Sequence, residues 1–311
     1  MIKLLSLFSG LGAFEEALKN ICIQFKIINY CEIVPYISKS YSLIHDISED
    51  LNLGDITKVN EHELKDFDLM TYGFPCQDIS SLGSQKGFLD VNGNLTRSGR
   101  FFDAIRIAKH KKPKYMIAEN VRALVSKPMK EDFETMIKLI DSIGYNSYFK
   151  IINSKEHGIP HSRNRVFIIS IRKDIDDGKF EFPNEIPLSI KASDLYDENV
   201  TPEFYLQKCH QKYFNDFRLK KKYSSLNSDV LICMSTKQGS KSCPQNFVHD
   251  DNGYRILTDS EMMAFQGFKK EYGLLLRNNG ITTKQIGHMC GNSITVNVLE
   301  NIFKKLFVDT L

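Results

Sequence analysis

The stretch Lys3-Leu-Leu-Ser-Leu-Phe8, which continues as Ser9-Gly-Leu-Gly12 and then as the helical pattern Phe14–Asn20, decides the fold. A compact apolar run that ends in a tight glycine turn and leads into a helix is typical of the first unit of an α/β sheet. Glycines in such a turn let the backbone approach a ligand closely, and the helix N-terminus favours negative charge. The third glycine of the dinucleotide-binding pattern is missing, which argues against a nicotinamide-dependent dehydrogenase.

Short apolar runs and helical patterns alternate from this stretch to about residue 172. The strands predicted after Lys3–Phe8 are Phe25–Cys31, Asp68–Tyr72, Lys114–Ala118, Tyr145–Ile152 and Arg165–Ile171. The helices predicted between them are Phe14–Asn20, a helix that begins at Pro35, Phe101–His110 and Glu131–Ile143. This alternation predicts βαβ units and a mostly parallel, Rossmann-like α/β sheet that is covered on both faces.

The pattern changes after Lys173. Residues 176 to about 253 are richer in Pro, Asn, Asp and Lys, and they hold the basic run Arg218–Lys222. This composition predicts a second, smaller domain with little regular structure, and 311 residues fit about two domains of roughly 150 residues each. A final amphipathic helix carries Val298, Ile302 and Leu306 in step.

Composition excludes few partners but bounds the compartment. Lys and Arg number 41 against 38 Asp and Glu, a net charge of +3 that neither proves nor excludes a polyanionic partner. The seven cysteines are widely spaced and form no Cys-x-x-Cys pair, so we expect neither a disulfide framework nor a metal site. No apolar run approaches the ~20 residues needed to cross a bilayer. We therefore expect a cytoplasmic protein.

Two acidic residues stand where nucleotide-type sheets bind a ribose. Glu32 ends the second predicted strand, and Asp55, in Gly54-Asp-Ile-Thr57, follows the next strand position. An acid there can hydrogen-bond a ribose, although an exposed loop acid is the commoner fate of a single Glu. Together with the glycine turn, the two acids favour an adenosyl pocket.

Gly73-Phe-Pro-Cys-Gln77 is the most informative segment. Cys76 directly follows a strand and lies after Pro75, so a rigid turn is expected to present its thiol at the functional edge of the sheet. Nucleophilic catalysis requires such a thiol, which attacks as the thiolate, whereas a random free Cys is usually a small buried hydrophobe. The long segment 78–100 is rich in Gly and Ser and is typical of a lid.

Three further side chains could act on a substrate. Glu119, in Glu119-Asn-Val121, ends an apolar run, where burial can raise the pKa of a carboxyl group so that it donates a proton. Arg163 and Arg165 share a parity and would face one side of an extended segment. They could clamp an anion or a base, but two such arginines are ordinarily a solvated strand edge.

Taken in this order, these stretches resemble the C5-cytosine-specific DNA methyltransferase family of the bacterial and phage type. The matching segments are Phe8–Phe14, Glu32, Asp55, Gly73–Gln77, Glu119–Val121, Arg163–Arg165 and Gly291-Asn-Ser293. The resemblance implies an S-adenosylmethionine-dependent methyltransferase sheet formed by residues 1–175 and 285–311, with a small, irregular target-recognition domain at 176–284. It also implies a monomer that acts on duplex DNA without a membrane or a metal, with a restriction endonuclease as a candidate partner.

The resemblance implies a role for each matched residue. Cys76 would attack cytosine C6, Glu119 would bond N3, Arg165 would hold O2, and Arg163 would organise the loop. The residues implied for S-adenosyl-L-methionine are Phe8, Ser9, Gly10, Leu11, Gly12, Glu32, Ile33, Asp55, Ile56, Phe74, Pro75, Asn292 and Ser293. Those implied for DNA are Gln77, Ser81, Gln85, Lys86, Arg97, Arg100 and Lys237.

One departure and two rivals follow from the same motifs. The family usually has Gln-x-Arg-x-Arg, and His161 stands at the Gln position. The change affects the hydrogen bonding that positions the catalytic loop, so it could weaken the enzyme or add pH dependence. His161 is the feature that favours a catalytically weak DNA-binding homologue, which Cys76 and Glu119 oppose. The tRNA-directed branch typically has Pro-Pro-Cys-Gln and Cys-Phe-Thr. Neither occurs here: Phe74 precedes Pro75, and the sequence contains no Cys-Phe-Thr.

Overall fold

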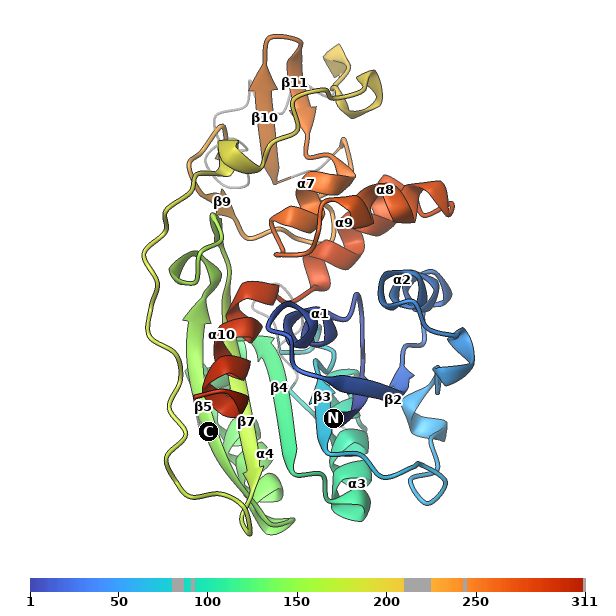
Figure 1. Cartoon of the computed structure of the whole chain (residues 1–311), viewed down its shortest axis with the longest axis vertical. Coiled ribbons are helices and arrows are strands. Elements are labelled where there is room, and N and C mark those ends of the chain that lie inside the picture. Colours follow the sequence, from blue (N-terminus) through green and yellow to red (C-terminus); the bar gives the residue numbers. More distant parts are fainter. Residues whose placement is uncertain (80–86, 91–92, 210–224, 243–244, 310–311) are drawn as a thin grey trace.

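A six-stranded sheet forms the base of the molecule, and a smaller part rises from one end of it (Figure 1). A computed structural model describes the chain except for residues 80–86, 91–92, 210–224, 243–244 and 310–311. The sheet strands are β1 (Ile2–Leu7), β2 (Phe25–Cys31), β3 (Leu69–Tyr72), β4 (Tyr115–Val121), β5 (Tyr145–Asn153) and β7 (Asn164–Arg172). Their order is β2-β1-β3-β4-β7-β5.

The sheet is mostly parallel, as predicted. β1 pairs in parallel with β2 and β3, and β3 pairs in parallel with β4. β7 is the exception, because it runs antiparallel to both β4 and β5. The six strands predicted by residue range are present, with ends that differ by a few residues.

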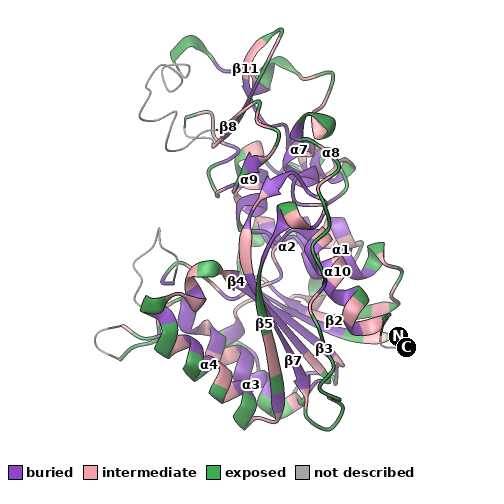
Figure 2. Ribbon diagram, turned by 90° about the vertical axis from the view of Figure 1, so that its left-hand side faces the viewer, coloured by how far each residue is buried: buried purple, intermediate pink, exposed green. Residues whose placement is uncertain are grey.

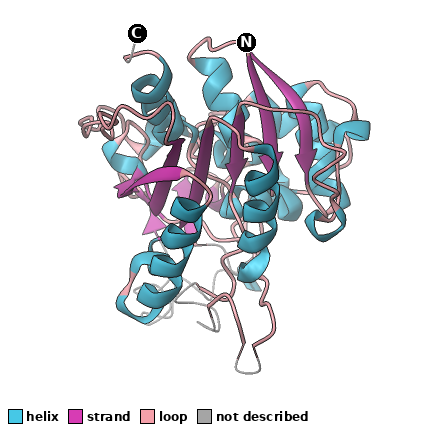
Figure 3. Cartoon of the chain, turned by 90° about the horizontal axis from the view of Figure 1, so that it is seen from below, coloured by secondary structure: helices cyan, strands magenta, loops and turns pink. Residues whose placement is uncertain are grey.

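Helices cover both faces of the sheet (Figure 3). One face carries α1 (Ala13–Asn20), α2 (Pro35–His45) and α10 (Val296–Phe307), and the other carries α3 (Phe101–Lys111) and α4 (Lys130–Ser142). The alternation of side chains along a strand sorts the core residues between the faces. In β1, Leu4 packs with the first group of helices, whereas Leu5 and Leu7 pack with the second.

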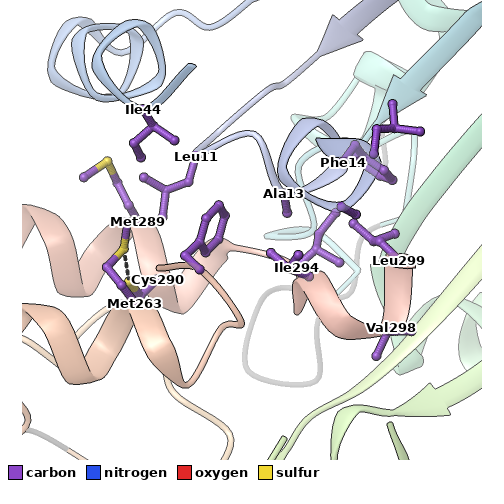
Figure 4. Close-up of a cluster of buried hydrophobic side chains, with 14 of the residues drawn as sticks. Leu11, Ala13, Phe14, Ile44, Met263, Met289, Cys290, Ile294, Val298 and Leu299 are labelled. Carbon is purple, nitrogen blue, oxygen red and sulfur yellow. Dashed lines mark hydrogen bonds between the residues drawn. The ribbon is translucent and has the colours of Figure 1, made fainter. Parts of the chain in front are cut away.

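The core of the first face continues into the C-terminal helices. These are α7 (Asp259–Ala264), α8 (Glu271–Asn278) and α9 (Thr283–Asn292). Figure 4 shows Leu11 of the glycine turn and Ile44 of α2 beside Met289 and Cys290 of α9. The turn that follows β1 is therefore packed directly against the helix that precedes Ser293.

The chain between residue 173 and β11 has little regular structure in its described parts, as predicted. Its first part, up to about residue 190, runs along the sheet as a largely exposed strap (Figure 2), and its other described parts belong to the smaller part of the molecule. Its short strands are β8 (Ser225–Leu226), β9 (Leu231–Ile232), β10 (Asn246–Asp250) and β11 (Gly253–Ile256). β10 and β11 form an antiparallel hairpin, and β9 pairs with β6 (His161–Ser162), which ties this region to the strand that precedes β7. The basic run Arg218–Lys222 lies outside the described residues.

Single turns of 3₁₀ helix join the larger elements. They are η1 (Glu49–Leu51), η2 (Ile56–Lys58), η3 (Ser98–Arg100), η4 (Arg122–Val125), η5 (Lys127–Met129), η6 (Ser154–Glu156), η7 (Ala192–Leu195) and η8 (Pro202–Phe204). The expected strand before Asp55 is wrong: that segment makes one isolated bridge, between Tyr30 and Asn52. The side chain of Asn52 fixes this segment instead, because it bonds the backbone of Glu32 and the N–H of Gly54.

Within the described residues, no helix is long and apolar enough to cross a membrane.

Candidate active site

A cavity of about 740 Å³ opens where β1 to β4 end, at the edge of the sheet that binds ligands in open α/β folds. It is lined by all four predicted catalytic residues, Cys76, Glu119, Arg163 and Arg165. The predicted cofactor residues that line it are Phe8, Ser9, Gly10, Leu11, Glu32, Ile33, Asp55, Ile56, Phe74, Pro75, Asn292 and Ser293. Of the residues predicted to bind the cofactor, only Gly12 does not line the cavity.

The glycine turn is built to be tight. Phe8, Gly10 and Gly12 all have positive φ angles, of 53°, 57° and 76°. A Cβ atom on Gly12 would lie 2.0 Å from Nε2 of His45, which donates a hydrogen bond to Leu11 O (3.0 Å). Glycine is therefore needed here for its conformation and for its lack of a side chain.

Glu32 connects this turn to the end of β2. Its carboxylate accepts hydrogen bonds from Gly10 N (3.3 Å) and Val34 N (2.9 Å). Burial raises the pKa of Glu32, while these N–H donors oppose the shift. The carboxylate is thus held between two loops at the wall of the cavity.

Asp55 and Cys31 form the next part of the wall. Asp55 Oδ1 accepts from the backbone N–H (3.0 Å) and the hydroxyl (2.9 Å) of Thr57, which lower the pKa of this carboxyl group. Cys31 Sγ donates to Gly54 O (2.8 Å), and burial raises its pKa to about 12. Asp55 is therefore a charged acceptor, whereas Cys31 is an inert thiol that the sequence did not single out.

Core packing and a hydrogen bond hold the loop that carries Cys76. Phe74 is buried against the rings of Phe88 (6.0 Å) and Phe101 (5.6 Å), and its carbonyl accepts from Asn120 Nδ2 (3.1 Å). Phe88 belongs to the predicted lid, so part of that segment is anchored in the core. Asn120 was not predicted as a site residue, although it lies inside the Glu-Asn-Val motif.

The thiol of Cys76 faces the cavity but is not prepared as an anion. Burial raises the pKa of Cys76, the charge of Glu119 raises it further, and Arg165 and Arg163 lower it in part. The surroundings of Cys76 in the protein alone therefore favour the neutral thiol.

Glu119 and Arg165 form an ion pair beside Cys76. Arg165 Nε lies 2.9 Å from Glu119 Oε1, and Glu119 is only 7% exposed. Burial raises the pKa of Glu119, and the positive charge of Arg165 opposes this shift. The predicted direction for Glu119 is confirmed, and its carboxyl group can hold a proton more readily than a solvated one.

Arg163 is 2% exposed and joins three segments. Its Nη1 donates to Cys233 Sγ (3.3 Å) and Met234 O (3.2 Å). Its Nη2 donates to Gly291 O (3.0 Å) and Ser293 O (2.6 Å). Neither arginine is a solvated strand edge.

His161 is completely buried and makes two hydrogen bonds. Its Nε2 accepts from Met234 N (3.0 Å), so Nδ1 carries the proton and donates to Phe265 O (3.1 Å). Burial lowers the pKa of His161 well below its ordinary value, and the nearby arginines lower it further. Both ring nitrogens are thus hydrogen-bonded, and the surroundings of the ring favour its neutral form, which argues against weaker bonding or an added pH dependence.

Only some of the residues predicted to contact DNA line the cavity. Gln77, Arg97 and Arg100 line the mouth of the cavity. The side chain of Arg97 is 69% exposed and lies 3.5 Å from Asp78, and Arg100 pairs with Asp103 at 3.3 Å. Lys237 is exposed on the turn after β9, outside the cavity. Ser81, Gln85 and Lys86 lie outside the described residues.

Comparison with known proteins agrees with this geometry. The family model described as C-5 cytosine-specific DNA methylase matches residues 2–308. This chain belongs to the C-5 cytosine-specific DNA methylase family. It is a DNA (cytosine-5)-methyltransferase. The family that its motifs resemble is thus confirmed.

The methylase is similar to bacterial and phage enzymes. It is 36% identical over 273 residues to the type II methyltransferase M2.ScrFI of Lactococcus lactis subsp. cremoris, covering 82% of this chain and 71% of the relative. It is 27% identical over 330 residues to M.Bsp6I of Bacillus sp. (strain RFL6), covering 98% and 100%. It is 38% identical over 174 residues to the orphan methyltransferase M.Rho11sI of Bacillus phage rho11s, but there it spans only 34% of the phage protein.

Solved structures share the fold of the methylase. The S. pombe Dnmt2 methyltransferase superposes with a TM-score of 0.77 at 21% identity, covering 100% of this chain and 99% of that one. The Entamoeba histolytica methyltransferase EhMeth gives 0.80 at 17% identity with the same coverage. At these identities the likeness concerns the fold alone.

Proposed function

We propose that the methylase transfers a methyl group from S-adenosylmethionine to C5 of a cytosine that is rotated out of duplex DNA, with Cys76 as the nucleophile. The observation that carries the proposal is the convergence of Cys76, Glu119 and Arg165 on one cavity whose other wall is the glycine turn with Glu32.

The cofactor side of the cavity fits an adenosyl group. A half-buried carboxylate at Glu32 suits a ribose, and the apolar side chains of Ile33 and Ile56 could flank an adenine. Phe8 and Phe74 offer aromatic surface to a sulfonium cation. When bound there, S-adenosylmethionine supplies an electrophilic methyl group, and the chain orients it.

The base side of the cavity can activate a cytosine. C5 is a poor nucleophile until the Cys76 sulfur bonds to C6, which makes C5 electron-rich. A protonated Glu119 donates to N3, and Arg165 donates to O2, so charge that builds on the ring is stabilised. After C5 has accepted the methyl group it loses its proton, the bond from C6 to sulfur breaks, and 5-methylcytosine is released.

A platform beside the cavity supports a role for Lys237 in DNA recognition. The buried side chain of Gln238 bonds Asn246 through the backbone N–H, the carbonyl and the side-chain amide of Asn246. Gly287 and Gly291 of α9 leave room for this turn, because Cβ atoms there would lie 2.2–2.3 Å from its backbone. A lysine on such a rigid turn can donate to guanine in the major groove or to a phosphate.

These features support a division of labour along the chain. We propose residues 1–175 and 285–311 as the catalytic part and 176–284 as the target-recognition part, with Gln77, Arg97 and Arg100 as DNA contacts at the cavity mouth. Rotating the base out costs a few kcal/mol, which contacts of this kind must offset.

The setting of the enzyme follows from its substrate. We propose that it acts as a monomer on DNA in the cytoplasm. The type II relatives favour a cognate restriction endonuclease as its partner, whereas the orphan phage relatives favour action without one.

Covalent trapping tests the proposal. Purified protein should transfer labelled methyl groups to duplex DNA, and Cys76→Ser should lower the rate at least about 10³-fold, because a neutral hydroxyl is a far weaker nucleophile. A duplex with 5-fluorocytosine should form an adduct at Cys76, and Cys209→Ser, which changes an exposed cysteine, should leave trapping unchanged. An adduct at another cysteine, or methylation of tRNA alone, would contradict the proposal.

A further inference from the structure

Arg163 is a buried cation that has no carboxylate partner among the described residues. Its side chain is 2% exposed, and three of the four groups that it contacts through Nη1 and Nη2 are backbone carbonyls. A guanidinium taken out of water is costly unless an opposite charge lies close to it. Glu119 is a carboxylate on which the charges of both arginines act, and it pairs with Arg165.

The fourth group is the sulfur of Cys233, which directly follows β9. Arg163 Nη1 lies 3.3 Å from Cys233 Sγ. Burial alone would raise the pKa of this thiol, but the charges of Arg163 and Arg165 outweigh it and bring the pKa below the ordinary value. Cys76, which the charges of the same arginines also affect, has a raised pKa. The surroundings thus favour the thiolate at Cys233 and the neutral thiol at Cys76.

A charge on Cys233 would matter most during catalysis. Glu119 must carry a proton to donate to N3, and its ion pair with Arg165 is then lost. A thiolate at Cys233, 3.3 Å from Arg163 Nη1, would then be the negative charge that remains beside the arginines. Arg163 also holds Gly291 and Ser293 at the cofactor end of the cavity, so its position affects both halves of the site.

We propose that Cys233, as a thiolate, is a positioning residue that balances Arg163 and Arg165 and thereby keeps the active site assembled when Glu119 is protonated. The inference rests on the proposed function, because it assigns Glu119 the donor role. The groups that face Cys233 are Arg163 and Arg165 from β6–β7 and, through Arg165, Glu119 from β4.

A purely structural role for this cysteine is the competing explanation. Cys233 Sγ also lies 3.7 Å from Met234 O, a contact that a neutral thiol could make as a donor. A neutral thiol that fills space would be replaced best by Ser or Ala, whereas a thiolate would be replaced best by Asp. The two explanations therefore predict opposite orders of activity.

Full-length protein with Cys233→Ser, Cys233→Ala or Cys233→Asp separates them. Loss of one charge-assisted hydrogen bond predicts that Cys233→Ser lowers kcat about tenfold, and Cys233→Asp should recover most of the loss. Cys209→Ser, at an exposed cysteine, is the matched control and should keep the wild-type kcat. An Asp variant no faster than the Ser and Ala variants would overturn the proposal.

An optical measurement gives a second test that does not depend on activity. The ultraviolet thiolate absorbance of the wild-type protein, minus that of Cys233→Ser, should be present at pH 7, and its absence would overturn the proposal. If the wild-type protein transfers no methyl group and forms no adduct, the proposed function itself fails. A thiolate signal then still reports on Cys233, so the two failures can be told apart.

Discussion

His161 shows how a different side chain can meet the same bonding requirement. The position normally holds Gln, whose amide has one acceptor oxygen and an N–H donor. The neutral imidazole offers the same pair in the same place, since Nε2 accepts from Met234 N and Nδ1–H donates to Phe265 O. The substitution therefore preserves the link between β9, the strand before β7 and the segment after α7, and it gives no support to a catalytically weak homologue.

Substitution of His161 tests whether the two side chains are equivalent. His161→Gln should keep methyl-transfer activity within about twofold of the wild type, because both hydrogen bonds can form. His161→Leu, of similar bulk, should destabilise the protein by about 2 kcal/mol or more, since it leaves Met234 N and Phe265 O buried without partners. Steady-state kinetics and urea unfolding measure the two effects. A collapse of activity in the Gln variant would give the imidazole a role of its own.

At the scale of elements, α9 determines where the turn at 235–239 lies. Gly287 and Gly291 stand one helical turn apart on the face of α9 that meets this turn. Gly-to-Ala changes inside helices normally stabilise by about 1 kcal/mol. Here the new Cβ would lie 2.2 Å from the backbone N of Gly239, where nothing flexible can give way. The steric effect should therefore decide the sign.

Gly287→Ala tests this packing. We expect a net loss of about 1–2 kcal/mol in the free energy of unfolding and weaker, less specific DNA binding, because the turn with Lys237 is pushed away. Urea unfolding gives the first quantity, and bisulfite sequencing of methylated DNA gives the second. Lys284→Ala, at an exposed position of the same helix, is the control and should change neither. Unchanged specificity in Gly287→Ala would argue against a reading role for the turn.

The elements also show what the sequence could reveal. Periodicity and glycine turns predicted the sheet and its helices, because those signals are local, and strand ends brought Glu32, Cys76 and Glu119 to one edge. The contact of Arg163 with Cys233 joins residues 70 positions apart in a region without periodicity, so no local pattern carried it. The same holds for the glycines of α9, whose purpose is visible only with the turn in place.

At the scale of the whole molecule, folding buries histidines in a neutral form. His45 lies behind the glycine turn, and burial lowers its pKa from 6.5 to about 4, although the bond to Leu11 O opposes the shift. As the pH falls below 6.5, the unfolded chain takes up a proton that the folded protein does not accept. The stability that His45 contributes is therefore complete above about pH 6.5 and is lost as the pH falls towards 4.

Unfolding at two pH values tests the direction in which His45 changes the stability. Between pH 7 and pH 5, His45 alone should lower the free energy of unfolding by about 2 kcal/mol. Buried carboxyl groups with raised pKa values, such as Glu15 and Glu32, act in the opposite direction, so the wild-type change alone does not isolate His45. Urea unfolding of His45→Gln at both pH values does, because its loss should be smaller than that of the wild type by this amount. His62→Gln, at an exposed histidine, should match the wild type, and an equal loss in all three proteins would show that His45 is not the group that titrates.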